Sequence, residues 1–365
     1  MQKLRYTILI VFVFMLVSSC MHDEELWQQD PLNLENLSNR GVFIINEGNF
    51  MYDNASLSYY DIENDTMYND VFFNANALPL GDVAISMQIH GDLAYIVVNN
   101  SGKIYIINKN NFSYEGKITG LTSPRYIHFI SDEKAYVSDL YARAITIVNP
   151  QTQSITGYID LNNGESQYYQ HPTEEMIQVG QYVFVNCWSY DNKILVIDSQ
   201  TDALVDSITV GIQPRSMALD KNNNLWAGCD GGFQGSTYGY EEASLIKINT
   251  STFQVEDTWT FDLEDDIGRL CMNGNRDTLF FLNKDVYCFP VESSGAPQVL
   301  IQSPYQSSFT GFNGIGVDPL SSEIYVADAK DFNQSGRIIK YNPDALPVDT
   351  LNCGVIPSYF LFTHY

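Results

Sequence analysis

The sequence predicts an all-β protein: a seven-bladed β-propeller with four-stranded blades, whose ring is closed by the C-terminal strand. Three observations predict this fold. One strand pattern, apolar-aromatic-apolar and ending in Asn or Asp, recurs along the chain. A second apolar strand follows each copy at short distance. The chain also ends in a strand that no neighbouring repeat accounts for.

The first pattern occurs seven times, and the ends of successive copies are separated by 40 to 53 residues. A period of this length is typical of propeller blades with loop insertions. The copies lie at residues 42–46, 95–99, 135–139, 183–186, 225–230, 279–283 and 324–328.

Three further strands complete each repeat. The second apolar strand lies at residues 57–61, 104–108, 145–149, 194–198, 245–249, 286–290 and 338–342. A more polar strand comes next, as expected of an outer edge, with examples at 154–159, 204–208 and 255–259. A strand that often begins with Pro precedes the first pattern, as at 124–128, 214–218 and 313–317.

The first repeat lacks such a preceding strand, and residues 356–362 match the missing type. We therefore expect the C-terminal strand to complete the first blade and remove the open edge of the ring. A β-sandwich or two separate domains are the alternatives. Seven aligned copies of two distinct strands favour the propeller over both.

The N-terminal residues predict export. Lys3 and Arg5 precede an apolar run at 8–17, which is too short to cross a bilayer core of roughly 30 Å. The run ends at Cys20 in a sequence that resembles the bacterial lipobox. The predicted organisation is a lipoprotein signal peptide at 1–19, lipidated Cys20 with a flexible acidic tether at 20–40, and the propeller at 41–365. An ordinary secreted protein with an incidental cysteine is the alternative.

The acidic cluster at 21–25 resembles the surface-export signal of Bacteroidetes lipoproteins, although a merely solvated tether would look the same. The resemblance implies an outer-membrane protein that faces the cell exterior. Because no other stretch is long and apolar enough to span a bilayer, membrane contact is expected through the lipid alone.

Charge and cysteine content exclude several functions. Acidic residues outnumber basic ones by 44 to 19, a net charge of −25, which disfavours nucleic-acid binding. Five cysteines remain besides Cys20, with no C-x-x-C pair and no His at metal-ligand spacing, so no metal site is predicted. These thiols are expected to be buried, with one optional disulfide between Cys271 and Cys288.

The sequence contains no motif that indicates catalysis, and a binding protein is predicted rather than an enzyme. His90 and His128 fall on predicted innermost strands, where core packing is expected. Residues 220–224 are interpreted as an Asn-rich hairpin turn rather than a calcium loop. The acid pairs at 174–175, 241–242 and 265–266 are expected to be solvated, although pairs from different blades could form a glycosidase dyad.

Aromatic, Asn, Gln and Ser residues gather in the loops that follow the first strand pattern, on the face that also carries the connections between blades. Aromatic rings give flat apolar contact, and neutral amides orient a ligand that bears amides or hydroxyls. From these loops and the strand starts beside them we predict a binding site formed by Tyr52, Asn99, Arg125, Tyr141, Trp188, Tyr190, Phe233, Tyr240 and Phe332.

The repeats resemble the YncE-like propellers, and together with the lipobox and the acidic export signal they resemble the BtuG family of surface lipoproteins of gut Bacteroides. This resemblance implies that the chain captures vitamin B12 (cobalamin) as a transported ligand, needs no cofactor, and delivers the corrinoid to an outer-membrane TonB-dependent transporter. A glycan- or protein-binding propeller of another surface uptake system is the first alternative. A propeller enzyme such as a lyase or lactonase is the second.

Overall fold

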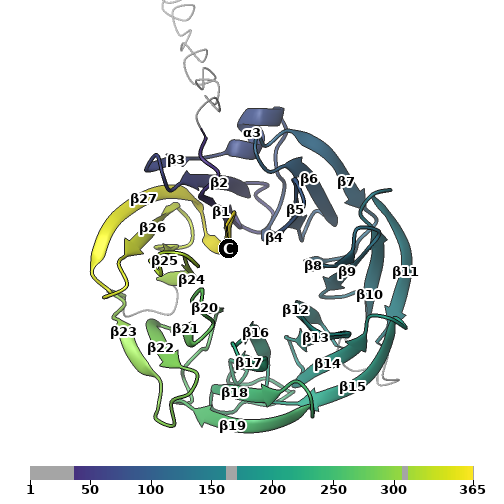
Figure 1. Cartoon of the computed structure of the whole chain (residues 1–365), viewed down its shortest axis with the longest axis vertical. Coiled ribbons are helices and arrows are strands. Elements are labelled where there is room, and N and C mark those ends of the chain that lie inside the picture. Colours follow the sequence, from purple (N-terminus) through teal and green to yellow (C-terminus); the bar gives the residue numbers. More distant parts are fainter. Residues whose placement is uncertain (1–36, 162–170, 306–310, 365) are drawn as a thin grey trace, which may run out of the picture. The chain divides into compact units, whose positions relative to one another are not determined.

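The computed structural model describes residues 37–161, 171–305 and 311–364. Within them the chain forms seven antiparallel sheets of four strands each, arranged in a ring (Figure 1), which confirms the predicted seven-bladed propeller. The predicted signal peptide, Cys20 and most of the tether lie outside the described residues. In the described part of the chain, no helix is long and apolar enough to cross a membrane.

The two inner strands of every blade are short and close to the axis. The innermost strands are β28 (Pro357–Phe362), β4 (Ala84–His90), β8 (Pro124–Ser131), β12 (Thr173–Val179), β16 (Pro214–Leu219), β20 (Leu270–Met272) and β24 (Phe312–Val317). The second strands are β1 (Gly41–Asn46), β5 (Leu93–Val98), β9 (Lys134–Asp139), β13 (Tyr182–Cys187), β17 (Asn224–Cys229), β21 (Thr278–Asn283) and β25 (Ile324–Asp328).

The two outer strands complete each sheet in chain order. The third strands are β2 (Ser56–Asp61), β6 (Lys103–Asn108), β10 (Ala144–Asn149), β14 (Lys193–Asp198), β18 (Ser244–Asn249), β22 (Asp285–Pro290) and β26 (Ser335–Tyr341). The outermost strands are β3 (Thr66–Tyr68), β7 (Tyr114–Thr119), β11 (Ser154–Asp160), β15 (Ala203–Thr209), β19 (Gln254–Thr260), β23 (Gln298–Ile301) and β27 (Pro347–Val355).

Burial follows the residue types of these strands. Every residue of β1 is buried, and its sequence is apolar except at its two ends. Most residues of β19 are exposed, and its sequence is polar or charged except at Val255 and Trp259. The strand that the repeat predicts most clearly is thus the second strand of each blade, because both of its faces pack against neighbouring blades.

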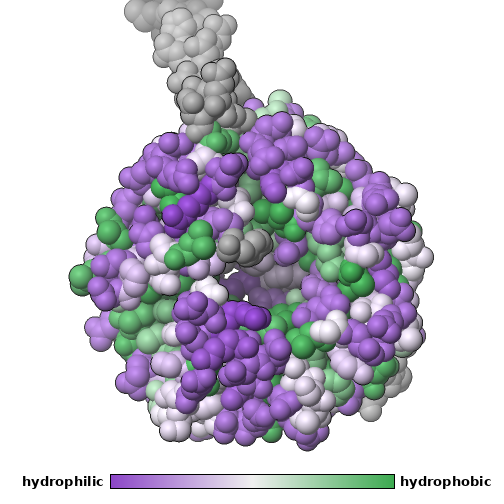
Figure 2. Space-filling view, viewed as in Figure 1, coloured by the Kyte–Doolittle hydropathy of each residue, from purple (hydrophilic) through white to green (hydrophobic). Residues whose placement is uncertain are grey.

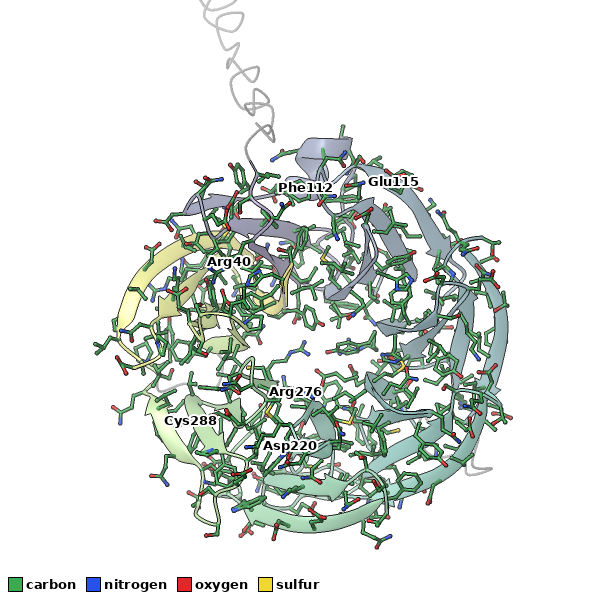
Figure 3. The ribbon with its side chains drawn as sticks, in the orientation of Figure 1. Arg40, Phe112, Glu115, Asp220, Arg276 and Cys288 are labelled. Carbon is green, nitrogen blue, oxygen red and sulfur yellow. The ribbon has the colours of Figure 1, made fainter. Side chains whose placement is uncertain are left out.

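The hydrophobic core lies between blades rather than within one sheet, and side chains fill these spaces around the ring (Figure 3). Trp226 on β17 is fully buried and stacks on Trp259 of β19, with 5.4 Å between ring centres. Phe289 of the next blade packs edge-on against Trp226 at 5.8 Å. Because each interface holds its own cluster, no blade can bury its apolar residues without both neighbours.

The ring closes as predicted. Strand β28 pairs antiparallel with β1, from Val42 opposite Phe362 to Asn46 opposite Pro357. Arg40, just before β1, forms an ion pair of 2.8 Å with Asp318 at the end of β24. The C-terminal strand is therefore the innermost strand of the first blade, and a buried carboxylate ties the last blade to the residue before β1.

One helix lies among the described residues: α3 (Val71–Asn76), between β3 and β4. Its Phe72 is buried against Tyr105 of β6, with 4.8 Å between ring centres. The helix covers the outer part of the gap between the first two blades (Figure 1).

The two faces of the ring differ in what they carry. One face of the ring carries the loops that follow the second strands and the connections between blades, and we call it the upper face. On the lower face, the chain enters β1 after Arg40 and leaves β28 at Thr363, whose N–H donates to the carbonyl of Gly41 at 2.9 Å. The predicted ligand-binding loops all belong to the upper face.

Candidate functional site

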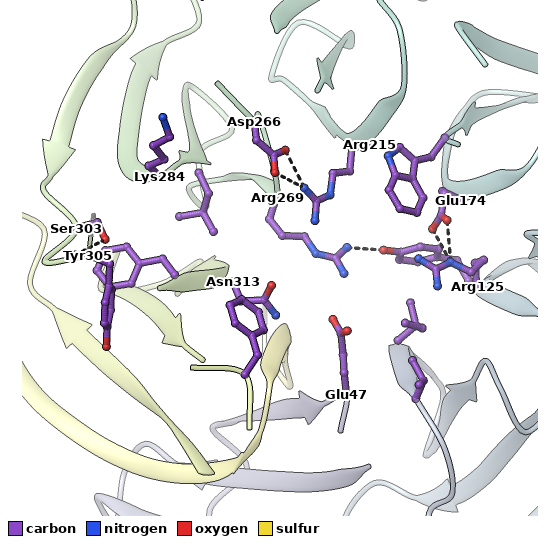
Figure 4. Close-up of a pocket in the computed structure, with 18 of the residues that line it drawn as sticks. Glu47, Arg125, Glu174, Arg215, Asp266, Arg269, Lys284, Ser303, Tyr305 and Asn313 are labelled. Atoms are coloured by element: carbon purple, nitrogen blue, oxygen red, sulfur yellow. Dashed lines mark hydrogen bonds and ion pairs between the residues drawn. The ribbon is translucent and has the colours of Figure 1, made fainter. Parts of the chain in front are cut away.

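The upper face opens into a cavity of about 500 Å³ at the mouth of the central channel (Figure 4). The cavity is lined by the first residues of the innermost strands and by the loops after the second strands. Its polar and aromatic lining residues include Glu47, Arg125, Tyr126, Glu174, Trp188, Arg215, Glu264, Asp266, Arg269, Lys284, Tyr305, Asn313 and Phe332. Figure 2 views the ring from the opposite, lower face and shows the hollow at its centre from that side.

β-Bulges explain why consecutive residues of one strand both face the channel. The pairing register shifts near the start of β8, β12 and β16. A bulge re-aims side chains that regular alternation would place on opposite faces. Glu174 and Glu175 therefore both contribute to the channel from β12, at the mouth and one step below it. The expectation that this acid pair is solvated was wrong, because both carboxylates are largely buried.

At the mouth, two arginines are each held by a carboxylate from the following blade. The Nε of Arg125 lies 2.8 Å from the carboxylate of Glu174. One terminal nitrogen of Arg215 contacts both oxygens of Asp266, at 2.8 and 3.0 Å. The carboxylate of Asp266 raises the pKa of Arg215. These pairs fix where each guanidinium points.

Trp188 contributes an immobilised ring to the mouth. Its Nε1–H donates to Asp230 at 2.9 Å, and the guanidinium of Arg215 lies 5.9 Å from the ring centre. This distance is within the range of a cation–π contact. Glu47 extends from the end of β1 into the channel, on the side opposite Arg215 (Figure 4). The mouth thus combines fixed donors, carboxylates and one oriented aromatic face.

One level below, four neighbouring blades contribute a buried network, which we call the waist cluster: Tyr126, Glu175, Ser216 and Arg269. The four residues occupy the same position in their blades. In each blade, the next residue of the innermost strand pairs with the residue two positions before the end of the second strand. The four side chains therefore meet at one depth of the channel. The sequence shows no spacing that would reveal this, because they come from four different repeats.

Hydrogen bonds connect the waist cluster completely. Arg269 donates to the Tyr126 hydroxyl and lies 3.1 Å from Glu175. The other oxygen of Glu175 accepts the backbone N–H of Met217 at 2.6 Å and the Ser216 hydroxyl at 3.0 Å. Burial opposes the charge of Arg269, yet Tyr126 and Glu175 raise its pKa. Burial also raises the pKa of Glu175, against the effect of Arg269.

The waist cluster divides the channel into two chambers. Tyr126 and Arg269 line both the upper cavity and a second cavity of about 390 Å³ that lies toward the lower face. The lower chamber is mainly apolar, with side chains such as Ile127, Met217 and Ile315. Its His128 bonds Gln178 at 3.0 Å, and burial lowers the pKa of this histidine, so it acts as a packed neutral side chain.

Three of the nine predicted site residues line the upper cavity: Arg125, Trp188 and Phe332. The amide of Asn99 instead donates to Ser123 and to the carbonyl of Pro124, at 2.8 and 3.1 Å, and so braces the second blade to the third. The hydroxyl of Tyr240 likewise holds the next connection between blades, through the carbonyl of Leu263 at 2.6 Å.

The other four predicted residues are loop aromatics outside the cavity. Tyr190 and Phe233 form an edge-to-face pair with 6.1 Å between ring centres, which joins the loops of two adjacent blades. Tyr52 and Tyr141 are 75% and 48% exposed, on separate loops of the upper face. The sequence pattern singled out loop aromatics and passed over most of the charged inner-strand residues that line the cavity.

The structure shows the state of the optional Cys271–Cys288 disulfide and of the turn predicted at residues 220–224. Cys271 and Cys288 are free thiols on β20 and β22, where they pack against the apolar cluster between the last two blades. Asp220 caps its turn by accepting N–H groups from Asn222 and Asn224, both at 2.8 Å. Residues 220–224 form the predicted turn between β16 and β17.

Comparisons with other proteins agree on the fold. No curated protein sequence matches the chain. A quinonprotein alcohol dehydrogenase-like protein from Bacteroides thetaiotaomicron has a similar structure, with a TM-score of 0.67 at 16% identity over 89% of this chain and 79% of that one. A provisionally described 6-phosphogluconolactonase from Bacteroides uniformis gives 0.62 at 12% identity, over 89% of this chain and 100% of the other.

At such low identities these likenesses show a shared β-propeller and no shared activity. The sequence itself matches one family model over residues 40–343, from the residue before β1 to two residues after β26. The chain thus belongs to the family described as a domain of unknown function, DUF5074.

Proposed function

We propose that this protein captures a polar small molecule at the upper mouth of its channel and releases it unchanged. One observation carries the proposal: the guanidinium groups of Arg125, Arg215 and Arg269, from three blades, line a single cavity together with the Trp188 ring. Converging donors around an oriented aromatic face suit recognition of a ligand with many acceptor groups.

The ion pairs at the mouth preorganise these donors. A guanidinium has five N–H donors, and a carboxylate on one side leaves others for a ligand. Arg125 uses its Nε toward Glu174, so its terminal nitrogens remain for further partners. Because the carboxylates hold the arginines in place before binding, little side-chain entropy is lost when a ligand arrives.

The charge balance of the lining favours a neutral ligand over a strongly anionic one. Arg125, Arg215 and Arg269 are accompanied by Lys284, but the carboxylates of Glu47, Glu174, Glu264 and Asp266 line the same cavity. An anion would meet these carboxylates at short range. Amide and hydroxyl groups can instead accept from the arginines and donate to the acids.

Cobalamin is the ligand we propose, as the resemblance to BtuG proteins implies. Its amide side chains fit the mixed donor and acceptor lining, and its corrin ring is flat enough to stack on Trp188. The ligand is larger than a cavity of about 500 Å³. The ring would therefore cover the mouth, with only some of its side chains inside. We further propose that lipidated Cys20 anchors the protein to the outer membrane for delivery to a TonB-dependent transporter.

Calorimetric titration of residues 21–365 with cyanocobalamin tests the proposal. We expect one-to-one binding, weakened at least about 30-fold by Trp188→Ala and by Arg215→Ala, since aromatic and arginine anchors each contribute about 2 kcal/mol or more. Lys221→Ala is the matched control. It removes a cation from the lower-face hairpin of the same blade that carries Arg215.

Absence of heat at micromolar protein, with an intact fold by circular dichroism, would exclude cobalamin. Binding that survives both mouth substitutions would place the ligand elsewhere. In the first case the same titration with oligosaccharides tests the glycan alternative, because hydroxyl-rich ligands fit the same donors and acceptors.

A further inference from the structure

A cluster of metal-binding side chains lies beside the upper mouth, in the fourth blade. His171 precedes β12, Cys187 ends β13, and Asp191 lies in the loop between β13 and β14. The Nδ1 of His171 is 2.8 Å from a carboxylate oxygen of Asp191. One ligand atom from each of the three residues lies within 4.8 Å of the other two.

The cluster is shielded from water on most sides. Cys187 is fully buried, and the side chains of His171 and Asp191 are 12% and 9% exposed. Residues from three segments are therefore held together by the fold, since β12, β13 and the loop after β13 belong to one sheet. Sequence spacing did not reveal the cluster, because His171 and Cys187 are 16 positions apart.

We propose that His171, Cys187 and Asp191 bind a zinc ion, with water in the fourth position. Imidazole nitrogen, thiolate sulfur and carboxylate oxygen are the three ligand types that zinc takes in proteins, at about 2.0–2.3 Å. At these bond lengths, neighbouring ligands of a tetrahedral site lie roughly 3.3–3.8 Å apart. The observed cluster needs only small side-chain movements to reach that geometry.

The charges of the bound state balance. As the Sγ–Zn bond forms, the S–H bond of Cys187 breaks and its proton leaves to solvent. The thiolate and the Asp191 carboxylate then neutralise the two positive charges of the ion, while His171 binds as the neutral imidazole. Without a cation, a thiolate in this buried position would be strongly disfavoured beside Asp191.

The metal would fix one rim of the mouth. Trp188 directly follows Cys187, and Glu174 lies three residues after His171. An ion bound by all three residues therefore joins the loop that carries Trp188 to the start of β12. This site is independent of the ligand proposed above, because none of its residues lines the upper cavity.

The fifth blade provides a matched control. Cys229 ends β17 as Cys187 ends β13, and it is equally buried. Its neighbours are the Ser244 hydroxyl and the backbone of Gly211. Cys229→Ser therefore removes a thiol of the same burial and strand position outside the proposed zinc site.

The experiment is titration of chelator-treated residues 21–365 with zinc by calorimetry, and with cobalt by absorbance. We expect one zinc per chain and a thiolate-to-cobalt charge-transfer band. Cys187→Ser should abolish the band and weaken zinc binding at least about 100-fold, since even partners behind a ligand contribute 10–100-fold. His171→Ala should weaken zinc binding similarly, and Cys229→Ser should change neither signal.

Cobalt binding without the band, or zinc binding that Cys187→Ser leaves unchanged, would overturn the proposal and indicate adventitious binding by surface acids. If Cys187→Ser fails to fold, His171→Ala takes its place, because the side chain of His171 is partly exposed. Its zinc affinity and cobalt absorbance then decide the question. Neither measurement uses cobalamin, so failure of the zinc site and failure of the proposed capture function remain distinguishable.

Discussion

Asp230 is a buried carboxyl group of the upper face, and its hydrogen bond orients the ring of Trp188. It is 9% exposed, and it accepts hydrogen bonds from Trp188 and from the backbone N–H of Gly232, the latter at 2.8 Å. Burial raises its pKa from 3.8 to about 6, although these hydrogen bonds and Arg215 oppose the shift. The group that orients Trp188 therefore titrates close to neutral pH.

The first prediction follows from this raised pKa. Because the folded pKa exceeds the unfolded one, the stability that Asp230 contributes is full below about pH 4 and is lost as the pH rises through about 6. A difference of about 2 pKa units corresponds to at most about 3 kcal/mol. Between pH 4 and 7, Asp230→Asn should gain stability relative to wild type.

Urea unfolding of both proteins at several pH values measures this difference. The fluorescence of Trp188 should also change through about pH 6 in the wild type and not in Asp230→Asn. A constant stability difference across this range would show that Asp230 is ionised at an ordinary pKa.

At the scale of elements, the sequence predicted the strands better than it predicted the residues that line the upper cavity. The second strands are buried on both faces, so their apolar pattern is strong and repeats in every blade. The site depends instead on single residues at the starts of innermost strands. Pro124-Arg125 and Pro214-Arg215 form a repeated pair that could have indicated two arginines at one level.

The remaining site residues were not predictable in this way. Bulges decide whether Glu174 and Glu175 face the channel, and no sequence signal marks a bulge in β12. Arg269 meets Glu175 only because the ring places their blades around a common axis. Contacts of this kind, 94 residues apart, follow from the closed fold rather than from any local pattern.

The second prediction concerns the waist cluster. Glu175→Met should destabilise the protein by about 3–5 kcal/mol, because it leaves Arg269 buried without its carboxylate. Arg269→Met should be similarly damaging. The double variant should be more stable than either single one, since apolar side chains of similar volume can replace a buried pair.

Denaturant unfolding of the three variants completes a double-mutant cycle. If the double variant loses as much unfolding free energy as the two single variants together, Glu175 and Arg269 do not stabilise each other. The Lys221→Ala variant, altered at an exposed ion pair of the lower face, should lie within about 0.5 kcal/mol of wild type.

For the whole molecule, closure of the ring depends on Asp318 as well as on the β1–β28 ladder. Asp318 is fully buried and accepts hydrogen bonds from Arg40 at 2.8 Å and from the N–H of Leu320 at 2.7 Å. Burial opposes its charge, but these bonds, led by Arg40, lower its pKa to about 2. The carboxylate thus links the last blade to the residues before the first.

The third prediction is that Asp318→Asn destabilises the propeller by about 2 kcal/mol at neutral pH, as expected for a pKa lowered by nearly two units. Because the folded pKa lies below the unfolded one, this contribution is present above about pH 4 and is lost as the pH falls toward 2. Thermal unfolding of both proteins at pH 7 and pH 3 measures it. An equal difference at both pH values would contradict the assignment.

The chain enters the ring at Arg40 and leaves it at Thr363, and both positions lie on the face opposite the arginine-lined mouth. An affinity handle or fluorophore placed after the last strand would therefore leave the molecule on its lower face, away from the cavity. A sensor surface that holds the protein by that end would present every copy with its mouth toward the flowing solution. The propeller is thus suited by its connectivity to oriented display.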